Sequence, residues 1–172
     1  MDSELFSQIS TFIFDIDGVL TDGTILVLEN GVQARRMHIK DGYALQLAVK
    51  KNYRVVIISG AAPSPVVDRL EKLGITEIHM SVKDKKQFIA QLAATDQLSL
   101  AGILYMGDDM PDIAAMSIVG LPTCPSDAVT EIKGAVKYIS PVPGGLGCVR
   151  DVIEKVLKLR GDWNHAEGVT SR

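Results

Sequence analysis

Short runs of apolar and β-branched residues recur along the chain and constrain its fold more than any other feature of the sequence. Stretches with the spacing of an amphipathic helix separate these runs. Strands that alternate with helices are typical of a parallel sheet with helices on both of its faces. The runs cover residues 11–14, 54–58, 77–80 and 102–106. The sequence therefore predicts an α/β fold with a mainly parallel, Rossmann-like sheet.

The segments between the runs carry helix signals of their own. Val66, Leu70 and Leu73 keep a helical spacing that stops at Gly74, a residue type that commonly follows a helix end. Helices are also expected around residues 88–92 and over 149–159. The chain has 172 residues, of which 47% are hydrophobic, enough to bury the core of one domain. We expect a single domain over residues 1–172, with a core from about 11 to 159 and a frayed tail from about 161.

Two segments read as turns. Residues 24–38 contain Asn30-Gly31, a pair typical of a type I′ turn, so we expect a small β-hairpin that projects from the sheet. Residues 141–147, which contain two prolines and three glycines, form the most turn-rich stretch of the chain.

Charge and hydropathy exclude several classes of function. The formal net charge is −3, and acidic and basic residues are interspersed, so a nucleic-acid partner is not expected. The apolar runs are far shorter than a membrane span, and the first residues lack the features of a signal peptide. Cys124 and Cys148 form no metal-binding pattern and suit a cytoplasmic chain with reduced thiols.

Polar residues follow the apolar runs at the points where the predicted strands end. The carboxyl ends of parallel strands meet at one edge of a sheet, and ligands of open α/β sheets bind there. We therefore expect carboxylates, a hydroxyl, ammonium groups and backbone amides to gather at this edge. The segments are Asp15-Ile16-Asp17-Gly18, Ser59-Gly60, Lys83-Asp84-Lys85 and Gly107-Asp108-Asp109-Met110-Pro111-Asp112.

This set of groups suits phosphoryl transfer, in which a protein mainly positions the reactants and neutralises charge. A carboxylate can serve as the nucleophile and form an aspartyl-phosphate. So many acids would repel one another unless a cation lay among them. Oxygen ligands that leave room for water and phosphate favour Mg²⁺, so the sequence predicts a magnesium-dependent site.

The strand-end motifs resemble those of a known family. Asp15-Ile16-Asp17-Gly18-Val19-Leu20-Thr21-Asp22 is similar to the first motif of the haloacid dehalogenase superfamily of phosphatases, and Ser59, Lys85 and Gly107-Asp108-Asp109 fit its other three motifs in order. The resemblance covers residues 11 to 159 and extends to the capless branch that contains the 3-deoxy-D-manno-octulosonate 8-phosphate phosphatases. The closer resemblance is carried by Thr21-Asp22-Gly23, Lys40-Asp41-Gly42-Tyr43, residues 67–75 and residues 144–151.

The resemblance implies the chemical roles of three aspartates. Asp15 would be the nucleophile, and Asp17 would be the general acid that protonates the departing sugar oxygen and the base that then activates water. Mg²⁺ would be held by the side chains of Asp15 and Asp108 and by the backbone carbonyl of Asp17.

Supporting roles follow in the same way. Ser59 and Lys85 would bind the phosphoryl oxygens, and Asp109 would orient Lys85 or the water around the metal. Asp112 would either support the metal or be an ordinary carboxylate on a helix surface.

The substrate implied by the resemblance is a phosphate monoester of an eight-carbon sugar acid, used in lipopolysaccharide biosynthesis. Relatives commonly carry a charged residue where this chain has Ala61, so another cation would have to contact the sugar acid. Lys40, Arg69 or a neighbouring subunit's Arg150 could supply it. The resemblance also implies a homotetramer, in which the hairpin and a neighbour's glycine-rich segment close over the site. A cytoplasmic location is expected by default, because no signal peptide or membrane span is recognised.

Three alternatives remain at the level of sequence. A nine-carbon sugar-acid 9-phosphate phosphatase would use the same scaffold. A phosphorylatable signalling receiver combines similar residues, but it places the acidic pair after its first strand, whereas here Asp108-Asp109 comes late. A regulatory module with a decayed site would be expected to have lost at least one key side chain, and all are present.

Overall fold

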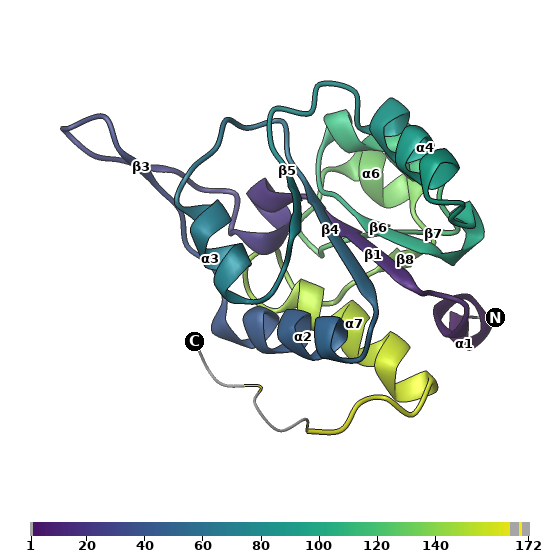
Figure 1. Cartoon of the computed structure of the whole chain (residues 1–172). Coiled ribbons are helices and arrows are strands. Elements are labelled where there is room, and N and C mark those ends of the chain that lie inside the picture. The colour runs from purple at the N-terminus through teal and green to yellow at the C-terminus, as the bar shows by residue number, and fades with distance from the viewer. Residues whose placement is uncertain (1, 166–168, 170–172) are drawn as a thin grey trace.

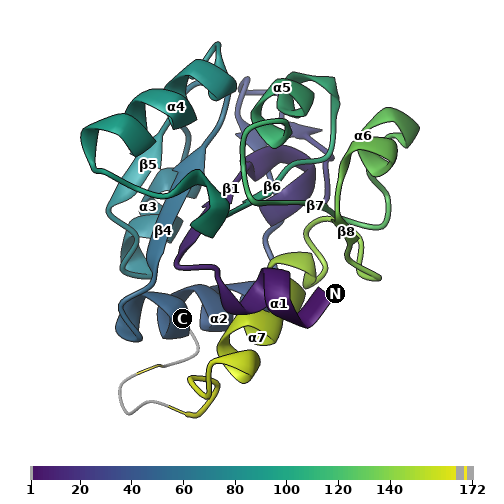
Figure 2. The ribbon, with the colours of Figure 1, turned by 90° about the vertical axis from the view of Figure 1, so that its right-hand side faces the viewer.

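The computed structural model describes residues 2–165 and 169 and shows one six-stranded sheet between two layers of helices (Figure 1, Figure 2). The strand order is β5-β4-β1-β6-β7-β8, and each neighbouring pair is parallel. The predicted Rossmann-like fold is therefore confirmed. The strands are β1 (Thr11–Phe14), β4 (Arg54–Ile58), β5 (Glu77–His79), β6 (Ile103–Met106), β7 (Leu121–Cys124) and β8 (Tyr138–Ile139).

Each face of the sheet buries its own hydrophobic cluster. Successive side chains of a strand point to opposite faces, so Phe12 and Phe14 belong to one cluster and Ile13 to the other. The first cluster packs against α1 (Asp2–Ser7), α2 (Ile39–Lys50), α3 (Val66–Lys72) and α7 (Cys148–Leu159). The second packs against α4 (Lys85–Thr95), α5 (Ile113–Met116) and α6 (Thr130–Ala135). The proposal that the chain is a single domain rests on this shared sheet.

The sheet has two more strands than the apolar runs predict. β7 contains Pro122, a residue that is depleted inside strands because it cannot donate a ladder hydrogen bond. β8 is only two residues long and gives no recognisable run. Both strands extend the sheet beyond β6, away from β1.

The expected hairpin projects from the molecule (Figure 1), with β2 (Leu26–Val27) and β3 (Gln33–Ala34) as its strands. The predicted type I′ turn is wrong. That turn needs a positive φ at Asn30, but the positive-φ residues in this segment are limited to Gly31 at +81°. The Gly31 amide donates to the Leu28 carbonyl, and the Leu28 amide donates to Val32, both at 2.9 Å. The loop therefore has three residues and a glycine bulge, which the same Asn-Gly pair also permits.

The chain leaves β1 toward β4 and β5 and returns to the other side of β1 for β6 and β7. The direction of winding therefore reverses between β1 and β6. In open α/β sheets, a crevice forms at such a reversal beyond the carboxyl ends of the strands. The fold thus places the residues that follow β1 and β6 on the two sides of one crevice.

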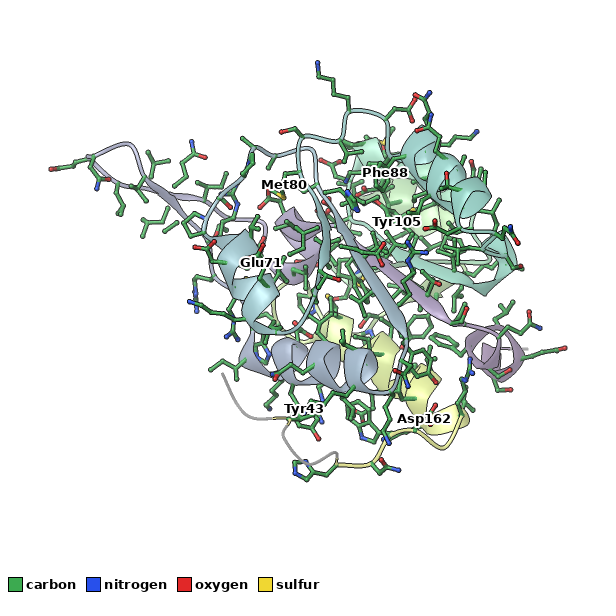
Figure 3. The ribbon with its side chains drawn as sticks, viewed as in Figure 1. Tyr43, Glu71, Met80, Phe88, Tyr105 and Asp162 are labelled. Atoms are coloured by element: carbon green, nitrogen blue, oxygen red, sulfur yellow. The ribbon has the colours of Figure 1, made fainter. Side chains whose placement is uncertain are left out.

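The tail that was expected to fray begins beside the end of α2. The Tyr53 hydroxyl donates to Asp162 at 2.7 Å, and the ring of Trp163 meets that of Tyr43 edge-on at 6.2 Å. Tyr43 and Asp162 both lie on the lower side of the molecule in Figure 3. The rest of this tail, residues 166–168 and 170–172, lies outside the described residues. Within the described part, none of the helices combines the length and the apolar character that a membrane span requires.

Candidate active site

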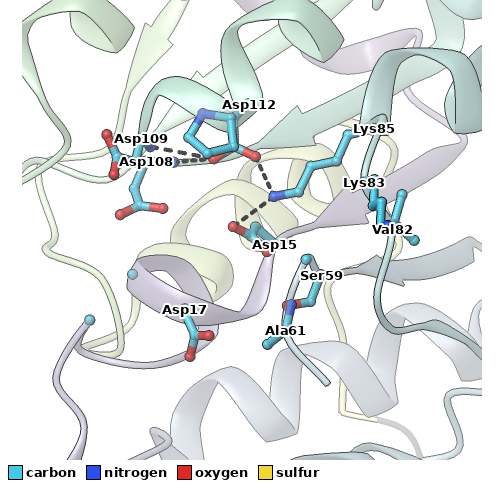
Figure 4. A pocket seen from close by; sticks show the side chains of 14 residues that line it. Asp15, Asp17, Ser59, Ala61, Val82, Lys83, Lys85, Asp108, Asp109 and Asp112 are labelled. Atoms are coloured by element: carbon cyan, nitrogen blue, oxygen red, sulfur yellow. Dashed lines mark hydrogen bonds and ion pairs between the residues drawn. The ribbon is translucent and has the colours of Figure 1, made fainter. Parts of the chain in front are cut away.

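A cavity of about 530 Å³ opens at the carboxyl ends of β1, β4 and β6 (Figure 4). This volume lies in the range of small-molecule sites. Residues from all four predicted strand ends line the cavity, so the gathering expected from the sequence is found. The predicted site residues among them are Asp15, Asp17, Ser59, Lys85, Asp108, Asp109 and Asp112.

Asp15 is buried directly after β1, at the start of the single helical turn η1 (Ile16–Leu20). Its carboxylate accepts a hydrogen bond from the Ile16 amide at 2.7 Å. The turn is irregular, because Gly18 has a φ of +82° that bends the chain around the carboxylate. This bend brings the backbone of Gly18 against the Asp108 side chain.

Lys85 is the first residue of α4 and reaches into the cavity beside Asp15 (Figure 4). Asp84 caps the helix by accepting from the Gln87 amide at 2.8 Å, which fixes the position from which Lys85 extends. The ammonium of Lys85 lies 2.9 Å from Asp15 Oδ2 and 2.6 Å from Asp112 Oδ1. Lys85 is therefore a buried cation shared by two carboxylates.

The carboxylate of Asp112 is fully engaged by donors of the protein. Its Oδ1 accepts from Lys85 and from the Tyr105 hydroxyl, and its Oδ2 accepts from the amides of Asp108 and Asp109 at 3.0 and 3.3 Å. Two acceptor positions on each oxygen are thus used. Asp112 is buried, so the predicted alternative of an ordinary carboxylate on a helix surface is wrong. Its filled oxygens favour support of Lys85 and of the loop after β6 over direct binding of a metal.

Asp112, and not Asp109, makes the contact with Lys85 that was predicted for Asp109. Asp109 instead caps the short helix η3 (Met110–Asp112), where its side chain accepts from the Met110 amide at 2.7 Å. Tyr105, which supports Asp112 from β6, was missed by the sequence reasoning, because a tyrosine inside an apolar run reads as core.

Negative charge is in excess around Lys85. Burial raises the pKa of Asp15 to about 6, although the Lys85 ammonium opposes this rise. Burial, aided by Asp112 and Asp15, raises the pKa of Asp108 to about 7. Burial lowers the pKa of Lys85, but the carboxylates of Asp15 and Asp112 outweigh it, so this pKa lies above its usual value. One ammonium therefore does not neutralise the cluster.

A hard divalent cation fits this donor set. Carboxylate oxygens of Asp15, Asp108 and Asp112 lie within 4.8 Å of one another. Because Asp112 is filled, Asp15 and Asp108 are the carboxylates left to bind the ion. Two carboxylates with room for water and phosphate oxygens suit Mg²⁺, which keeps several such ligands.

Ser59 lies buried at the end of β4 and faces the cavity beside Ala61. Its hydroxyl oxygen accepts from the Ala61 amide at 3.1 Å, so its proton can be donated to an anion in the cavity. Ala61 itself brings no charge to the lining, as its residue type predicts.

In the part of the chain that the structure describes, the three basic residues predicted to contact the sugar acid do not line this cavity. Lys40 is exposed in the first turn of α2, and Arg69 lines a separate cavity between α3 and the hairpin. Arg150 pairs with Glu154 at 3.0 Å and stacks on the Trp163 ring.

Asp17 is held by Arg35, a residue that the sequence reasoning did not single out. The guanidinium Nε lies 2.6 Å from Asp17 Oδ1. Arg35 directly follows β3, and the only signal for it in the sequence is the basic pair Arg35-Arg36 on the return of the hairpin.

The glycine-rich segment packs behind the site of its own chain. A Cβ atom on Gly144 would lie 2.0 Å from the Gly18 carbonyl oxygen, and the Gly145 amide donates to Val19 at 2.9 Å. Within its own chain, the segment supports the turn that carries Asp17; its closure over a neighbour's site stays a prediction.

Comparison with known proteins places this chain in a family. A search found no matching protein-family model. The 3-deoxy-D-manno-octulosonate 8-phosphate phosphatase of Escherichia coli K12 is 32% identical over 161 residues, which cover 94% of this chain and 86% of the relative. The chain belongs to the 3-deoxy-D-manno-octulosonate 8-phosphate phosphatase family.

Solved structures of the 3-deoxy-D-manno-octulosonate 8-phosphate phosphatase family match the whole fold. The Yersinia pestis enzyme aligns with a TM-score of 0.91 at 30% identity, covering 99% of this chain and 90% of that one. The Moraxella catarrhalis enzyme, solved with a magnesium ion, a phosphate ion and a KDO molecule, aligns with a TM-score of 0.89 at 30% identity, covering 94% and 92%. The family resemblance of the sequence is therefore confirmed.

Gly18 provides a test of the site geometry in this family member. A Cβ atom at Gly18 would lie 2.0 Å from Asp108 Oδ2, so Gly18→Ala must displace either the turn or the carboxylate. We expect the apparent Mg²⁺ affinity to fall by about 10–100-fold, as when the support of a metal ligand is lost. A magnesium titration of phosphate release measures the change.

Gly31→Ala is the matched control for Gly18→Ala. Gly31 has nearly the same φ, +81°, and a Cβ atom there would meet nothing within 4 Å. Both variants carry the strain of a left-handed alanine, about 1–2 kcal/mol, but only Gly18→Ala collides with Asp108. Equal magnesium dependence in the two variants would contradict the geometry described.

Proposed function

We propose that the chain is a Mg²⁺-dependent phosphatase that hydrolyses 3-deoxy-D-manno-octulosonate 8-phosphate through an aspartyl-phosphate on Asp15. One observation carries this proposal: Asp15 lies at the winding reversal of the sheet, paired with the buried Lys85 and beside the carboxylate of Asp108. A nucleophile, a phosphate-binding cation and a metal-binding carboxylate are thereby in contact within one cavity.

In the first half of the reaction, a carboxylate oxygen of Asp15 attacks the phosphorus of the substrate. The bond between phosphorus and the sugar oxygen breaks, and that oxygen takes both bonding electrons. Asp17 gives it a proton, which releases the sugar acid. In the second half, Asp17 takes a proton from water, the water oxygen attacks phosphorus, and the bond to Asp15 breaks to give inorganic phosphate.

The remaining residues bind the phosphoryl group. Lys85 and Ser59 donate to its oxygens, and Asp112 holds Lys85 in place. Asp15 and Asp108 would hold Mg²⁺, with the backbone carbonyl of Asp17 as a third ligand. When bound, the ion would supply positive charge that offsets the charge of the phosphoryl oxygens. The magnesium and phosphate ions solved with the Moraxella catarrhalis relative support the proposal that this enzyme binds both.

The identity of the sugar acid rests on the family and not on a residue of the cavity. Ala61 supplies no charge to the lining, so a nine-carbon sugar-acid 9-phosphate remains the second candidate substrate. The eight-carbon acid is preferred because the relatives described above act on it by name. The reaction then belongs to lipopolysaccharide biosynthesis.

Phosphate release in the presence of Mg²⁺ tests the substrate. We expect turnover of 3-deoxy-D-manno-octulosonate 8-phosphate to exceed that of nine-carbon 9-phosphates in kcat/KM, and chelation of the metal to abolish both. A preference for a nine-carbon ester would keep the mechanism and change the substrate. No release from any ester by folded, magnesium-loaded protein would favour a regulatory or phosphoacceptor module.

The enzyme is further proposed to act as a homotetramer in the cytoplasm. The hairpin exposes Leu26 and Val27 at 63% and 67%, which a neighbouring subunit would cover. Both cysteines are free, as in proteins of reducing compartments. Sedimentation velocity should give a tetramer that Leu26→Glu dissociates, and cell fractionation should recover the enzyme with cytoplasmic markers.

A further inference from the structure

One arginine of the hairpin donates hydrogen bonds to both oxygens of the Asp17 carboxylate. Arg35 Nε donates to Asp17 Oδ1 at 2.6 Å, and Arg35 Nη2 donates to Oδ2 at 3.3 Å. The Arg35 side chain is 9% exposed, whereas that of Asp17 is 38% exposed. The arginine is therefore the fixed partner, and the carboxylate is the one that faces the open cavity.

Arg35 owes its position to the base of the hairpin. Arg35 directly follows β3. Two residues later, Met37 forms an antiparallel β-bridge with Thr21, which directly follows η1. The bridge thus joins the hairpin to the Asp17 turn on one side of Arg35, and on the other side β3 pairs with β2. Arg35 also lines the cavity of about 320 Å³ between the hairpin and α3, as do Pro65 and Val66.

Asp17 needs such a partner because its own turn gives it little restraint. Its backbone is extended within η1, with φ −73° and ψ 123°, and its side chain is partly exposed. A carboxylate in this setting samples several rotamers. A bidentate guanidinium fixes the carboxylate plane and uses one acceptor position on each oxygen, which leaves the second position of each for proton exchange.

We propose that Arg35 is a positioning residue, which holds the Asp17 carboxylate in the orientation needed for proton transfer at the cavity. The inference rests on the proposed function, in which Asp17 exchanges protons with the leaving oxygen and with water. Arg35 acts through Asp17 and makes no contact with the phosphoryl group. The hairpin is by this account part of the catalytic apparatus of its own chain.

A double-mutant cycle tests the proposal in the magnesium-loaded enzyme. The variants are Arg35→Met, Asp17→Asn and their combination, assayed with 3-deoxy-D-manno-octulosonate 8-phosphate. Arg35→Met should lower kcat by about 10–100-fold, as for a misplaced catalytic group, with KM changed by less than about twofold. In the Asp17→Asn background, the same change should have almost no effect on kcat, because the group that Arg35 positions is gone.

Two further readouts separate positioning from a general effect of charge or folding. Arg35→Lys should restore only part of kcat, because one ammonium cannot form two parallel bonds to a carboxylate. With p-nitrophenyl phosphate, the rate of phosphoenzyme formation should fall less, because its leaving oxygen needs little protonation. Arg36→Met is the matched control: the Arg36 side chain is 87% exposed, and its distance to Asp22 is 3.9 Å.

Three results would overturn the proposal. An equal loss of kcat in wild-type and Asp17→Asn backgrounds would show that Arg35 acts independently of Asp17. A rise in KM without a fall in kcat would show that Arg35 binds the substrate. A loss of kcat in Arg36→Met equal to that in Arg35→Met would show that the positive charge of the hairpin, and not the contact with Asp17, causes the effect. If Arg35→Met does not fold by circular dichroism, Arg35→Gln replaces it in the cycle. Full activity of Asp17→Asn alone would instead contradict the proposed function.

Discussion

Replacing Asp15 by asparagine is expected to lower phosphate release by at least about 10⁴-fold, the order seen when a catalytic nucleophile is lost. The amide cannot attack phosphorus, and it carries no charge to hold the metal. The fold should persist, because Lys85 keeps its contact with Asp112 at 2.6 Å. Burial raises the pKa of Asp15 to about 6, so at pH 8 its ionised carboxylate is less stable in the folded protein than in the unfolded chain. The metal-free variant should therefore unfold at an equal or higher temperature than the wild type at pH 8.

The assay compares Asp15→Asn with Asp68→Asn, which makes the same chemical change at an exposed position of α3. Asp68→Asn should retain the wild-type rate. Acid-quenched wild-type enzyme should carry a hydroxylamine-sensitive acyl phosphate that Asp15→Asn lacks. Retention of more than about one per cent of the rate by a pure preparation of Asp15→Asn would remove Asp15 from the nucleophile's role.

Replacing Lys85 by methionine is expected to have the largest effect on stability as well as a large effect on catalysis. The side chain is 6% exposed between two carboxylates, and the substitution leaves both without their cation. Removal of one partner from a buried ion pair typically costs about 3–5 kcal/mol of unfolding free energy. Loss of a charged donor to the phosphoryl group should also lower kcat by about 10²–10³-fold. Urea unfolding and phosphate release measure the two effects.

The stability of Lys85→Met should depend strongly on pH. The folded-state pKa of Asp15 is about 6, above its usual 3.8, so the folded protein binds a proton that the unfolded chain releases. The free energy of unfolding therefore increases through Asp15 as the pH falls through about 6 toward 3.8. Without the ammonium, the pKa of Asp15 should rise further, so the variant should regain stability between pH 8 and pH 5.

Lys86→Met is the control for Lys85→Met, because Lys86 is the next residue of α4 and is exposed. It should change the unfolding free energy by less than about 0.5 kcal/mol. A loss of stability that is equal in the two variants would mean that the charge of α4, and not the buried pair, is responsible.

The sequence predicted the parts of the fold that local pattern determines. β1, β4, β5 and β6 follow from their apolar runs, and α3 stops where Gly74 takes a φ of +88°. β7 and β8 could not be predicted, because a proline and a two-residue length hide them from local pattern. The hairpin was predicted, but its turn was not, since Asn-Gly suits two loop geometries.

Some residues of the site could likewise be predicted from the sequence, and others could not. The residues that line the cavity follow strand ends, and the meeting of those ends at one edge is a consequence of the parallel sheet. Arg35 could not be found, because it reaches Asp17 over 18 positions through the fold of the hairpin. Tyr105 could not be predicted, because its ring packs in the core and only its hydroxyl group, which donates to Asp112, belongs to the site.

The filled carboxylate of Asp112 has a consequence for the energetics of catalysis. Its donors come from α4, β6 and the loop after β6, so it sets the distance between Lys85 and the amides of Asp108 and Asp109. None of these dipoles has to turn when a phosphoryl group arrives. The reorganisation that water would undergo around the same charge is completed when the protein folds, and the site is electrostatically preorganised.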